Sequence, residues 1–258
     1  MTQRGALADK VVIVTGAAQG IGEATARRLA SQGASVVIAD VLDEEGQKVS
    51  ASLGERSFFS HLDVTDATQW RECVAATERA FGAPTSLVSN AGVMVPGSVE
   101  TSSVEDFRRA CDVNTIGALL GIQAVAAPMR ERGGGSIVVV SSLSGLVASE
   151  GQAPYCASKA AGTILARCAA LELGDDQIRV NSVHPGRIET AMSQAATANL
   201  PAVGSYEGPP LGRLGQVDEV AALIAFLVSD ESAYMTGTQQ VIDGGRMAGL
   251  RYPRTRSH

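Results

Sequence analysis

The sequence lacks the features that mark several common classes of protein. No run of eighteen or more apolar residues occurs in the 258-residue chain, so we expect no membrane span. The formal net charge of -6 argues against binding nucleic acid through a broad basic surface. The N-terminal stretch MTQRGALADK has no apolar segment typical of a secretory leader. These absences favour a cytoplasmic protein.

Cysteine and histidine are too few and too scattered for common metal or disulfide sites. The four cysteines, Cys73, Cys111, Cys156 and Cys168, form no C-x-x-C pair. The three histidines show no H-x-x-x-H spacing. We therefore expect reduced thiols and no dedicated metal site.

Short β-branched runs alternate with segments of helical spacing along most of the chain. Such alternation implies crossover units, a parallel sheet and helices on both of its faces. No linker or internal repeat interrupts it, so we predict one α/β domain over 1–258, a Rossmann-like doubly wound sheet of about seven strands. The expected strands cover 11–15, 35–40, 57–62, 86–90, 136–142, 178–183 and 240–242, and the expected helices 21–32, 43–53, 66–81, 104–132, 154–174 and 217–229.

Two segments stand apart from this alternation. Residues 195–216 carry three prolines and several glycines, which is typical of an irregular excursion near a functional face. We expect a substrate lid over about 190–216. The tail over 249–258 is basic and polar, which predicts a surface arm.

A glycine-rich turn, TGAAQGIG, follows the first expected strand and opens a helix. Gly16 would let the chain turn sharply, Gly20 would let backbone N–H groups approach a pyrophosphate, and Gly22 would let the helix pack closely on the strand. The turn could also be only a tight connection. Its place after the first strand of a doubly wound pattern favours nucleotide binding.

Asp40 ends the second expected strand, where it bears on the choice of cofactor. A carboxylate here can accept both ribose hydroxyls of an adenosine and would repel a 2′-phosphate. No lysine or arginine follows closely to receive such a phosphate. NAD is therefore favoured over NADP, although Asp40 could instead cap the helix expected over 43–53.

Tyr155 and Lys159 lie four residues apart in YCASK, on one face of a long expected helix. A fixed cation favours the phenolate and would lower the tyrosine pKa from about 10 towards the range of a working acid or base. Ser142 lies thirteen positions earlier (155 − 142) at the end of the fifth expected strand, where ligands bind in open α/β sheets. Its hydroxyl would hold a substrate oxygen. Alone, a Tyr-Lys pair is also common on helical surfaces.

Together these motifs resemble the short-chain dehydrogenase/reductase family over 10–245. TGAAQGIG matches the family's T-G-x-x-x-G-x-G turn, and Ser142, Tyr155 and Lys159 match its catalytic residues. The resemblance implies that Lys159 also reaches the nicotinamide ribose. It further implies that Asn114, in DVNTIGA, helps to hold a water connecting the lysine to solvent.

The resemblance also implies the remaining cofactor contacts. Asp63 and Val64 would contact the adenine, although Asp63 could equally cap the helix from Asp66. The Asn-Ala-Gly element would line the cofactor, yet it is also ordinary loop chemistry. In HPGRIET, the backbone of Ile188 and the hydroxyl of Thr190 would bind the nicotinamide carboxamide. The expected cofactor residues are Gly16, Gln19, Gly20, Ile21, Gly22, Asp40, Asp63, Val64, Asn90, Ala91, Gly92, Tyr155, Lys159, Pro185, Gly186, Ile188 and Thr190.

The reaction implied by the resemblance is reversible hydride transfer between NAD and a secondary alcohol or ketone, as in bacterial hydroxysteroid and cyclic alcohol dehydrogenases. The expected walls are largely apolar without clustered positive charge, which favours a neutral, bulky or cyclic substrate. Two alternatives stay open, an NADPH-dependent biosynthetic ketoreductase and a non-catalytic dinucleotide sensor. The expected wall residues are Val93, Met94, Leu143, Gly145 and Gln152, with Ser142 and Tyr155 also touching the substrate.

Two further side chains have competing interpretations. His184 could be a base, but its place before Pro185 at a strand end favours a structural role. Cys156 could be a hydrolase nucleophile, but no histidine stands in a matching position, which favours packing. Because family members are commonly tetramers joined through two long helices, the resemblance implies a homotetramer through the helices over 104–132 and 154–174.

Overall fold

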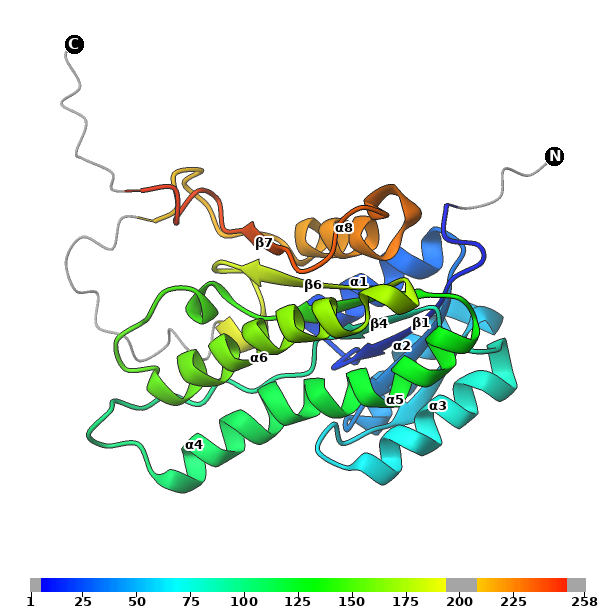
Figure 1. The fold of residues 1–258 in the computed structure, drawn as a ribbon. Coiled ribbons are helices and arrows are strands. Elements are labelled where there is room, and N and C mark those ends of the chain that lie inside the picture. Colours follow the sequence, from blue (N-terminus) through cyan, green and yellow to red (C-terminus); the bar gives the residue numbers. More distant parts are fainter. Residues whose placement is uncertain (1–5, 194–207, 250–258) are drawn as a thin grey trace, which may run out of the picture.

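The protein folds around a sheet in which every neighbouring pair of strands is parallel (Figure 1). The computed structural model describes residues 6–193 and 208–249. Within them the strand order is β3-β2-β1-β4-β5-β6-β7, which confirms the doubly wound prediction. The strands are β1 Val11–Thr15, β2 Ser35–Asp40, β3 Ser57–His61, β4 Ser86–Ser89, β5 Gly135–Val140, β6 Ile178–Pro185 and β7 Gln239–Ile242.

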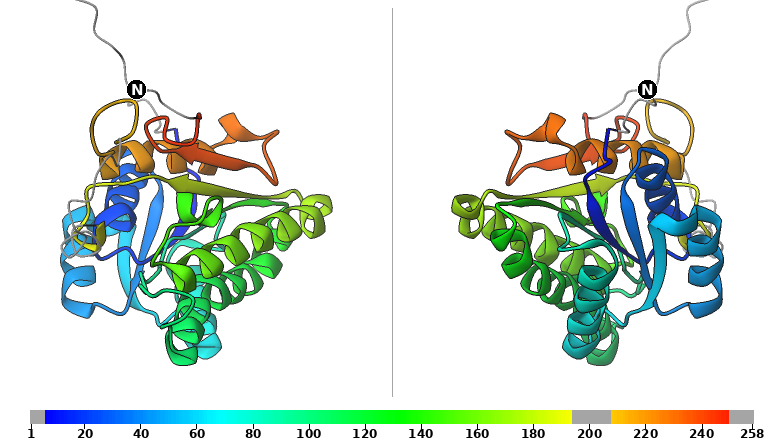
Figure 2. Two further views of the ribbon diagram at one scale, coloured as in Figure 1. Left: turned by 90° about the vertical axis from the view of Figure 1, so that its left-hand side faces the viewer. Right: turned by 90° about the vertical axis from the view of Figure 1, so that its right-hand side faces the viewer.

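Helices cover both faces of this sheet (Figure 2). The expected bounds agree with the structure to within two residues. The helices are α1 Gly20–Ser31, α2 Asp43–Leu53, α3 Ala67–Phe81, α4 Val104–Cys111, α5 Gly117–Glu131, α6 Ala153–Glu172 and α8 Val217–Val228.

Alternate residues of each strand build two separate cores. Val12 and Val14 of β1 pack with α1, α2 and α8, whereas Ile13 packs with α3, α5 and α6. Burying one such side chain contributes roughly 1.5–3 kcal/mol relative to leaving it exposed. Because a shift of one residue would exchange the two faces, these cores hold the strand register and with it the place where each strand ends.

The helix expected over 104–132 is present from Val104 to Glu131, with a π-helical turn inside it that the sequence did not predict. A π-helical turn, Asp112–Ile116, separates α4 from α5, and Gly117 N–H donates to the carbonyl of Asp112. An added Cβ on Gly117 would lie 2.7 Å from Val64 Cγ2, so the helix packs tightly on the segment after β3. Single π turns inside helices recur at functional sites, and this one carries the buried Asn114.

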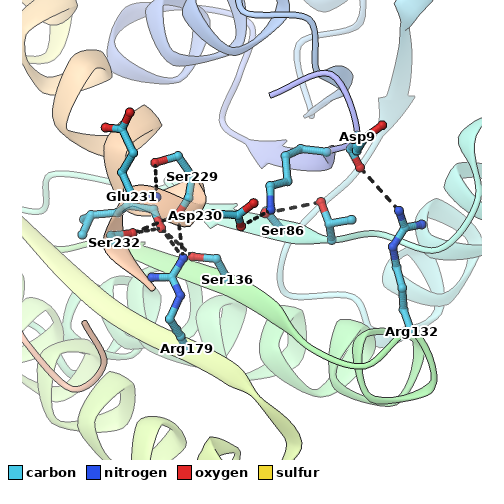
Figure 3. Close-up of polar contacts among 12 residues, drawn as sticks. Asp9, Ser86, Arg132, Ser136, Arg179, Ser229, Asp230, Glu231 and Ser232 are labelled. Atoms are coloured by element: carbon cyan, nitrogen blue, oxygen red, sulfur yellow. Dashed lines mark hydrogen bonds and ion pairs between the residues drawn. The ribbon is translucent and has the colours of Figure 1, made fainter. Parts of the chain in front are cut away.

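At the amino ends of the strands, polar side chains hold the C-terminus of α8 (Figure 3). Arg179 Nη2 donates to the carbonyls of Leu227 (2.9 Å) and Ser229 (3.1 Å). The hydroxyls of Ser136 and Ser232 donate to the same Leu227 carbonyl, at 2.8 and 3.0 Å. The last carbonyls of a helix have no partner within it, so these donors satisfy groups that would otherwise be buried unpaired.

We expect Arg179→Met to lower the free energy of unfolding by about 1–3 kcal/mol, because methionine keeps the apolar stem but leaves these carbonyls with fewer donors. Urea unfolding followed by circular dichroism measures the change. Arg71→Met, on the exposed surface of α3, is the matched control and should stay within about 0.5 kcal/mol of the parent protein. Equal losses for the two variants would contradict this account of the α8 terminus.

Candidate active site

A cavity of about 1390 Å³ opens where the strands end at their carboxyl edge. A drug-sized ligand usually occupies roughly 300–1,000 Å³, so this cavity has room for a dinucleotide and a second ligand. It is lined by every expected site residue except Gly22, Asn114 and Gly145, which lie behind its wall.

The glycine turn between β1 and α1 has the backbone geometry that only glycine adopts readily. Gly16 and Gly20 have φ values of +63° and +59°. Gln19, the residue before α1, makes no side-chain cap, so the first N–H groups of the helix are left for an anion. The turn therefore fits a pyrophosphate.

Gly22 has a different packing partner from the one expected. An added Cβ there would lie 2.0 Å from the Gly16 carbonyl oxygen and 2.6 Å from Asn90 Nδ2. The helix thus packs against the turn itself and against the residue that follows β4, rather than against the strand. Asn90 Nδ2 donates to the carbonyls of Thr15 (2.9 Å) and Gly16 (3.1 Å), which locks this arrangement.

Asp40 is buried at the end of β2, with 7% of its surface exposed, and lines the cavity. Its Oδ2 accepts from Ala18 N–H at 2.9 Å and its Oδ1 from Leu42 N–H at 3.1 Å. Each oxygen keeps a second lone pair for a ligand hydroxyl. Leu42, not Asp40, precedes α2 as its N-cap and has no side-chain cap, so the capping interpretation of Asp40 is wrong.

Asp63 and Val64 line the cavity beyond β3. Asp63 Oδ1 accepts from the N–H and the hydroxyl of Thr65, at 2.9 and 2.8 Å. The cap of α3 is Asp66, whose carboxylate accepts from Thr68 N–H and Gln69 N–H, and these bonds lower its pKa. The alternative in which Asp63 caps this helix is therefore wrong.

Tyr155 lies against Ser142 in the wall of the cavity, almost fully buried with 7% exposed. Burial raises the pKa of its phenol, and the hydrogen bond with Ser142 opposes that rise. The sequence-based expectation of a lysine-lowered pKa is therefore not met in this structure. The protonated phenol is the form that can donate to a ketone oxygen.

Lys159 is also buried, with 6% exposed, one turn along α6 from the tyrosine. Its Nζ donates to the carbonyl of Val140 at 2.9 Å and lies 5.9 Å from the centroid of the Tyr155 ring. Burial lowers the pKa of this ammonium to about 8. The lysine is thus held by the end of β5, in reach of the cavity.

Asn114 is held behind the cavity by three hydrogen bonds. Its Nδ2 donates to the Val93 carbonyl (3.0 Å) and to Ser158 Oγ (2.9 Å), and its Oδ1 accepts from Val93 N–H (2.8 Å). An added Cβ on Gly92 would lie 3.0 Å from this Oδ1 and 3.1 Å from Lys159 Nζ. Glycine at this position therefore leaves the space beside the ammonium open.

His184 is fully buried at the end of β6 and contacts the backbone of Ser142. Its Nδ1 lies 3.0 Å from the Ser142 carbonyl oxygen, and its Nε2 lies 2.8 Å from Ser182 Oγ. Because a carbonyl only accepts, Nδ1 carries the proton and Nε2 accepts from the serine hydroxyl. Burial lowers the histidine pKa, which fits a neutral structural group that braces β5 against β6.

The substrate walls differ from the expected ones in two respects: Gly145 does not line the cavity, and three arginines do. Gly145 packs on α6, where an added Cβ would lie 2.6 Å from Ser141 Oγ and 3.0 Å from the Lys159 carbonyl oxygen. The cavity is also lined by Arg109, Arg187 and Arg246, contrary to the expected lack of clustered positive charge. These arginines come from segments far apart in the sequence, so their grouping carried no local signal.

We expect Lys159→Met to stabilise the protein at pH 7, because it removes a buried ammonium. The folded pKa of about 8 lies below the ordinary value of 10.5, so the folded state binds this proton less readily than the unfolded state. The burial cost is fully present below pH 8 and is relieved as pH rises from 8 towards 10.5. The gain should be at most about 3 kcal/mol at pH 7, reduced by the lost bond to Val140.

Urea unfolding at pH 7 and at pH 10 checks this expectation, and the advantage of Lys159→Met over the parent protein should shrink at the higher pH. Lys48→Met, at an exposed position of α2, is the control and should show no such trend. An advantage that stays constant over this pH range would rule out the buried-ammonium account.

Comparison with known proteins agrees with this site. A family model described as "Enoyl-(Acyl carrier protein) reductase" matches residues 16–246. The chain is 42% identical over 248 residues to a 3-alpha-(or 20-beta)-hydroxysteroid dehydrogenase of Mycobacterium tuberculosis, covering 96% of this chain and 93% of that one. It is 41% identical over 252 residues to trans-4-hydroxycyclohexanecarboxylate dehydrogenase of Sinomonas cyclohexanicum, covering 94% and 95% of the two chains.

A solved structure has the same architecture. The crystal structure of levodione reductase superposes with a TM-score of 0.89 at 32% identity, covering 95% of this chain and 100% of that one. The architecture of the whole chain thus has a close counterpart among solved structures. The chain belongs to the short-chain dehydrogenase/reductase family and is an oxidoreductase that acts on CH–OH groups with a nicotinamide cofactor.

Proposed function

We propose that this protein reversibly transfers hydride between NAD(H) and a secondary alcohol or ketone on a bulky or cyclic skeleton. One observation carries the proposal: the buried phenol of Tyr155 shares one cavity with Ser142, the glycine turn and Asp40. A dinucleotide binding site and a proton donor for a carbonyl oxygen therefore face the same space.

In the proposed mechanism the nicotinamide, when bound, gives or takes the hydride, and the side chains handle the proton. Ser142 Oγ holds the substrate oxygen next to the phenol. In ketone reduction Tyr155 donates its proton to that oxygen, and in alcohol oxidation it takes the proton back. Lys159, with a pKa of about 8, is mostly protonated at neutral pH, and its charge would offset part of the penalty that burial places on the phenolate.

Asn114 and Gly92 have supporting roles in this proposal. Three hydrogen bonds fix Asn114 beside α6, and Gly92 keeps the space next to the ammonium open. We propose that a water in this space links Lys159 to solvent and restores the proton. The remaining cofactor residues would act as the family resemblance implies, with Ile188 and Thr190 at the carboxamide.

The preference for NAD rests on Asp40. Its buried carboxylate lines the cavity at the end of β2, the strand next to β1 and its glycine turn. A ribose with two free hydroxyls can donate to it, whereas a 2′-phosphate would place negative charge against negative charge. The resulting preference for NADH argues against the NADPH-dependent ketoreductase alternative.

We expect Asp40→Asn to weaken NADH binding about tenfold or more, because charge-assisted hydrogen bonds are replaced by neutral ones. Binding of NADPH should be unchanged or stronger, since the repulsion is gone. Fluorescence titration with each cofactor measures both affinities. Asp43→Asn, at an exposed position on α2, is the control and should leave them unchanged. Tighter binding of NADPH than of NADH by the parent protein would refute the NAD assignment.

A cyclic substrate is supported by the cavity and by the relatives. The cavity that Tyr155 lines is also lined by Met94, Leu143 and Val147, which suit an apolar ring system. The names of the relatives cover a hydroxysteroid, a hydroxycyclohexanecarboxylate and levodione. We propose a substrate of the same broad class, a secondary alcohol or its ketone on a ring.

Assembly into a homotetramer through the long helices is also proposed. Ile164 and Leu171 of α6 are 53% and 85% exposed in the single chain, and Phe107 and Ile116 are also exposed. Among the described residues one helix, Val104–Glu131, is long and apolar enough to cross a membrane by length and composition alone. Less than half of its most apolar segment is buried within the chain, as expected for a helix whose apolar surface packs against a second subunit. Light scattering would give the mass of the assembly.

Three further predictions stay predictions. The lid predicted over 190–216 falls partly on residues 194–207, which lie outside the described residues, as does almost all of the tail over 249–258. A cytoplasmic location stays a proposal, supported by four cysteines that are all free thiols.

We expect Tyr155→Phe to slow hydride transfer by between about one hundredfold and ten thousandfold. The substitution removes the phenolic hydroxyl, which donates and accepts the proton, and keeps the ring. Absorbance of NADH, followed with a panel of cyclic secondary alcohols and ketones, measures the rate. NADH affinity should change little, which shows that the variant is folded and distinguishes catalysis from binding. Near-normal turnover by this variant would overturn the proposed function. So would a parent protein that binds NADH but converts none of the alcohols or ketones in the panel.

A further inference from the structure

Two of the cavity arginines lie side by side although they are far apart in the sequence. Arg187 follows the end of β6 and Arg246 follows the end of β7, and these strands pair with Pro185 opposite Ile242. The segments stay in contact after the strands end, because an added Cβ on Gly186 would lie 2.8 Å from the Cα of Asp243. Both arginines line the cavity.

The turn that carries Arg246 is anchored on both sides of it. The carboxylate of Asp243 accepts from Gly245 N–H and from Met247 N–H, each at 2.7 Å. Arg246 lies between these two bonds and is half-buried. Its backbone is therefore held in place before any ligand arrives, which lowers the entropy lost on binding.

The electrostatics at this end of the cavity suit an anion. Burial, and then the charge of Arg187, lower the pKa of Arg246, so the two guanidinium groups lie within each other's field. An anion beside the pair would be attracted by both positive charges. A guanidinium has five donors in a planar fork, so each arginine can keep a contact with the protein and still bind a carboxylate.

The strand order separates this pair of arginines from the adenosine and pyrophosphate positions. Neighbouring strands are about 4.8 Å apart, so β6 and β7 lie roughly 5 and 10 Å from β5. Ser142 follows the end of β5. Strand β2, which carries Asp40, lies roughly 14 Å from β5 on its other side. His184, three residues before Arg187, touches the Ser142 carbonyl. The arginines therefore belong to the end of the cavity where the proton is transferred.

We propose that the substrate carries a carboxylate, or an anionic group of the same shape, which Arg187 and Arg246 bind while its ring hydroxyl or ketone faces Ser142 and Tyr155. This inference rests on the proposed function, since it names the substrate class of the same site. An anionic substrate replaces the neutral one favoured from the sequence. The neutral substrate was favoured because the expected walls had no clustered positive charge, whereas arginines line the cavity.

Ligand binding in the presence of NADH tests the inference without requiring turnover. Calorimetric titrations at physiological salt compare cyclohexanecarboxylate with cyclohexanecarboxamide, and a steroid carboxylate with its amide, on the parent protein. Each acid should bind about tenfold more tightly than its neutral amide. The variants Arg246→Gln and Arg187→Gln should lose about tenfold and about threefold of that preference, less for Arg187 because it is exposed.

Two control variants separate a specific contact from general electrostatics. Arg71→Gln removes the same charge from the exposed surface of α3 and should leave the preference unchanged. Glu150→Gln removes a carboxylate that lines the cavity, and the preference should stay the same or rise. The affinity for NADH should stay within about twofold of the parent value in every variant.

Three results would overturn the inference. The first is equal affinity for acid and amide in both pairs, including no binding by either. The second is an Arg71→Gln effect as large as that of Arg246→Gln. The third is a loss of NADH affinity in the arginine variants with the acid preference kept, which would assign the pair to the phosphates of the cofactor. Turnover of neutral cyclic alcohols by the parent protein reports on the proposed function separately.

Discussion

The site depends on the close contact between the turn after β1 and the first residues after β4. The hydroxyl of Thr15 accepts from the N–H groups of Asn90 and Ala91, each at 3.0 Å, while Asn90 returns two bonds to the turn. Because β1 and β4 are neighbours at the point where the strand order reverses, this contact shapes the crevice in which ligands bind. Gly22 has no room for a side chain here, so the contact also places the N-terminus of α1.

The geometry of the candidate site is maintained at a cost in stability. Lys159 is a buried ammonium that donates to the Val140 carbonyl, and its depressed pKa records the penalty of burial. The π turn around Asn114 interrupts what would otherwise be a regular helix. Both features bring polar groups to the ends of β4 and β5, where a packed apolar core would be more stable but could not move a proton.

The carboxyl edge of the sheet arranges the chemistry in order. Asp40 lies at the end of β2, the glycine turn at β1, Asn90 at β4, Ser142 at β5, and the two arginines beyond β6 and β7. A ligand lying along this edge would therefore meet a hydroxyl-binding carboxylate first, then an anion-binding helix terminus, then a proton donor. Arg187 and Arg246 continue this series of cavity-lining groups beyond β6 and β7.

Sequence alone determined the elements, their order and the residues of the local motifs, because strand and helix periodicity and the spacing of TGAAQGIG and YCASK are short-range properties. Only the tertiary structure decided what each group contacts. The raised pKa of Tyr155 comes from burial, the π turn at Asn114 from packing against Val64 and Val93, and the choice of Asp66 over Asp63 as a cap from loop geometry. Arg187 and Arg246 are fifty-nine positions apart (246 − 187), so their meeting depends on the pairing of β6 with β7, a long-range contact that no local pattern encodes.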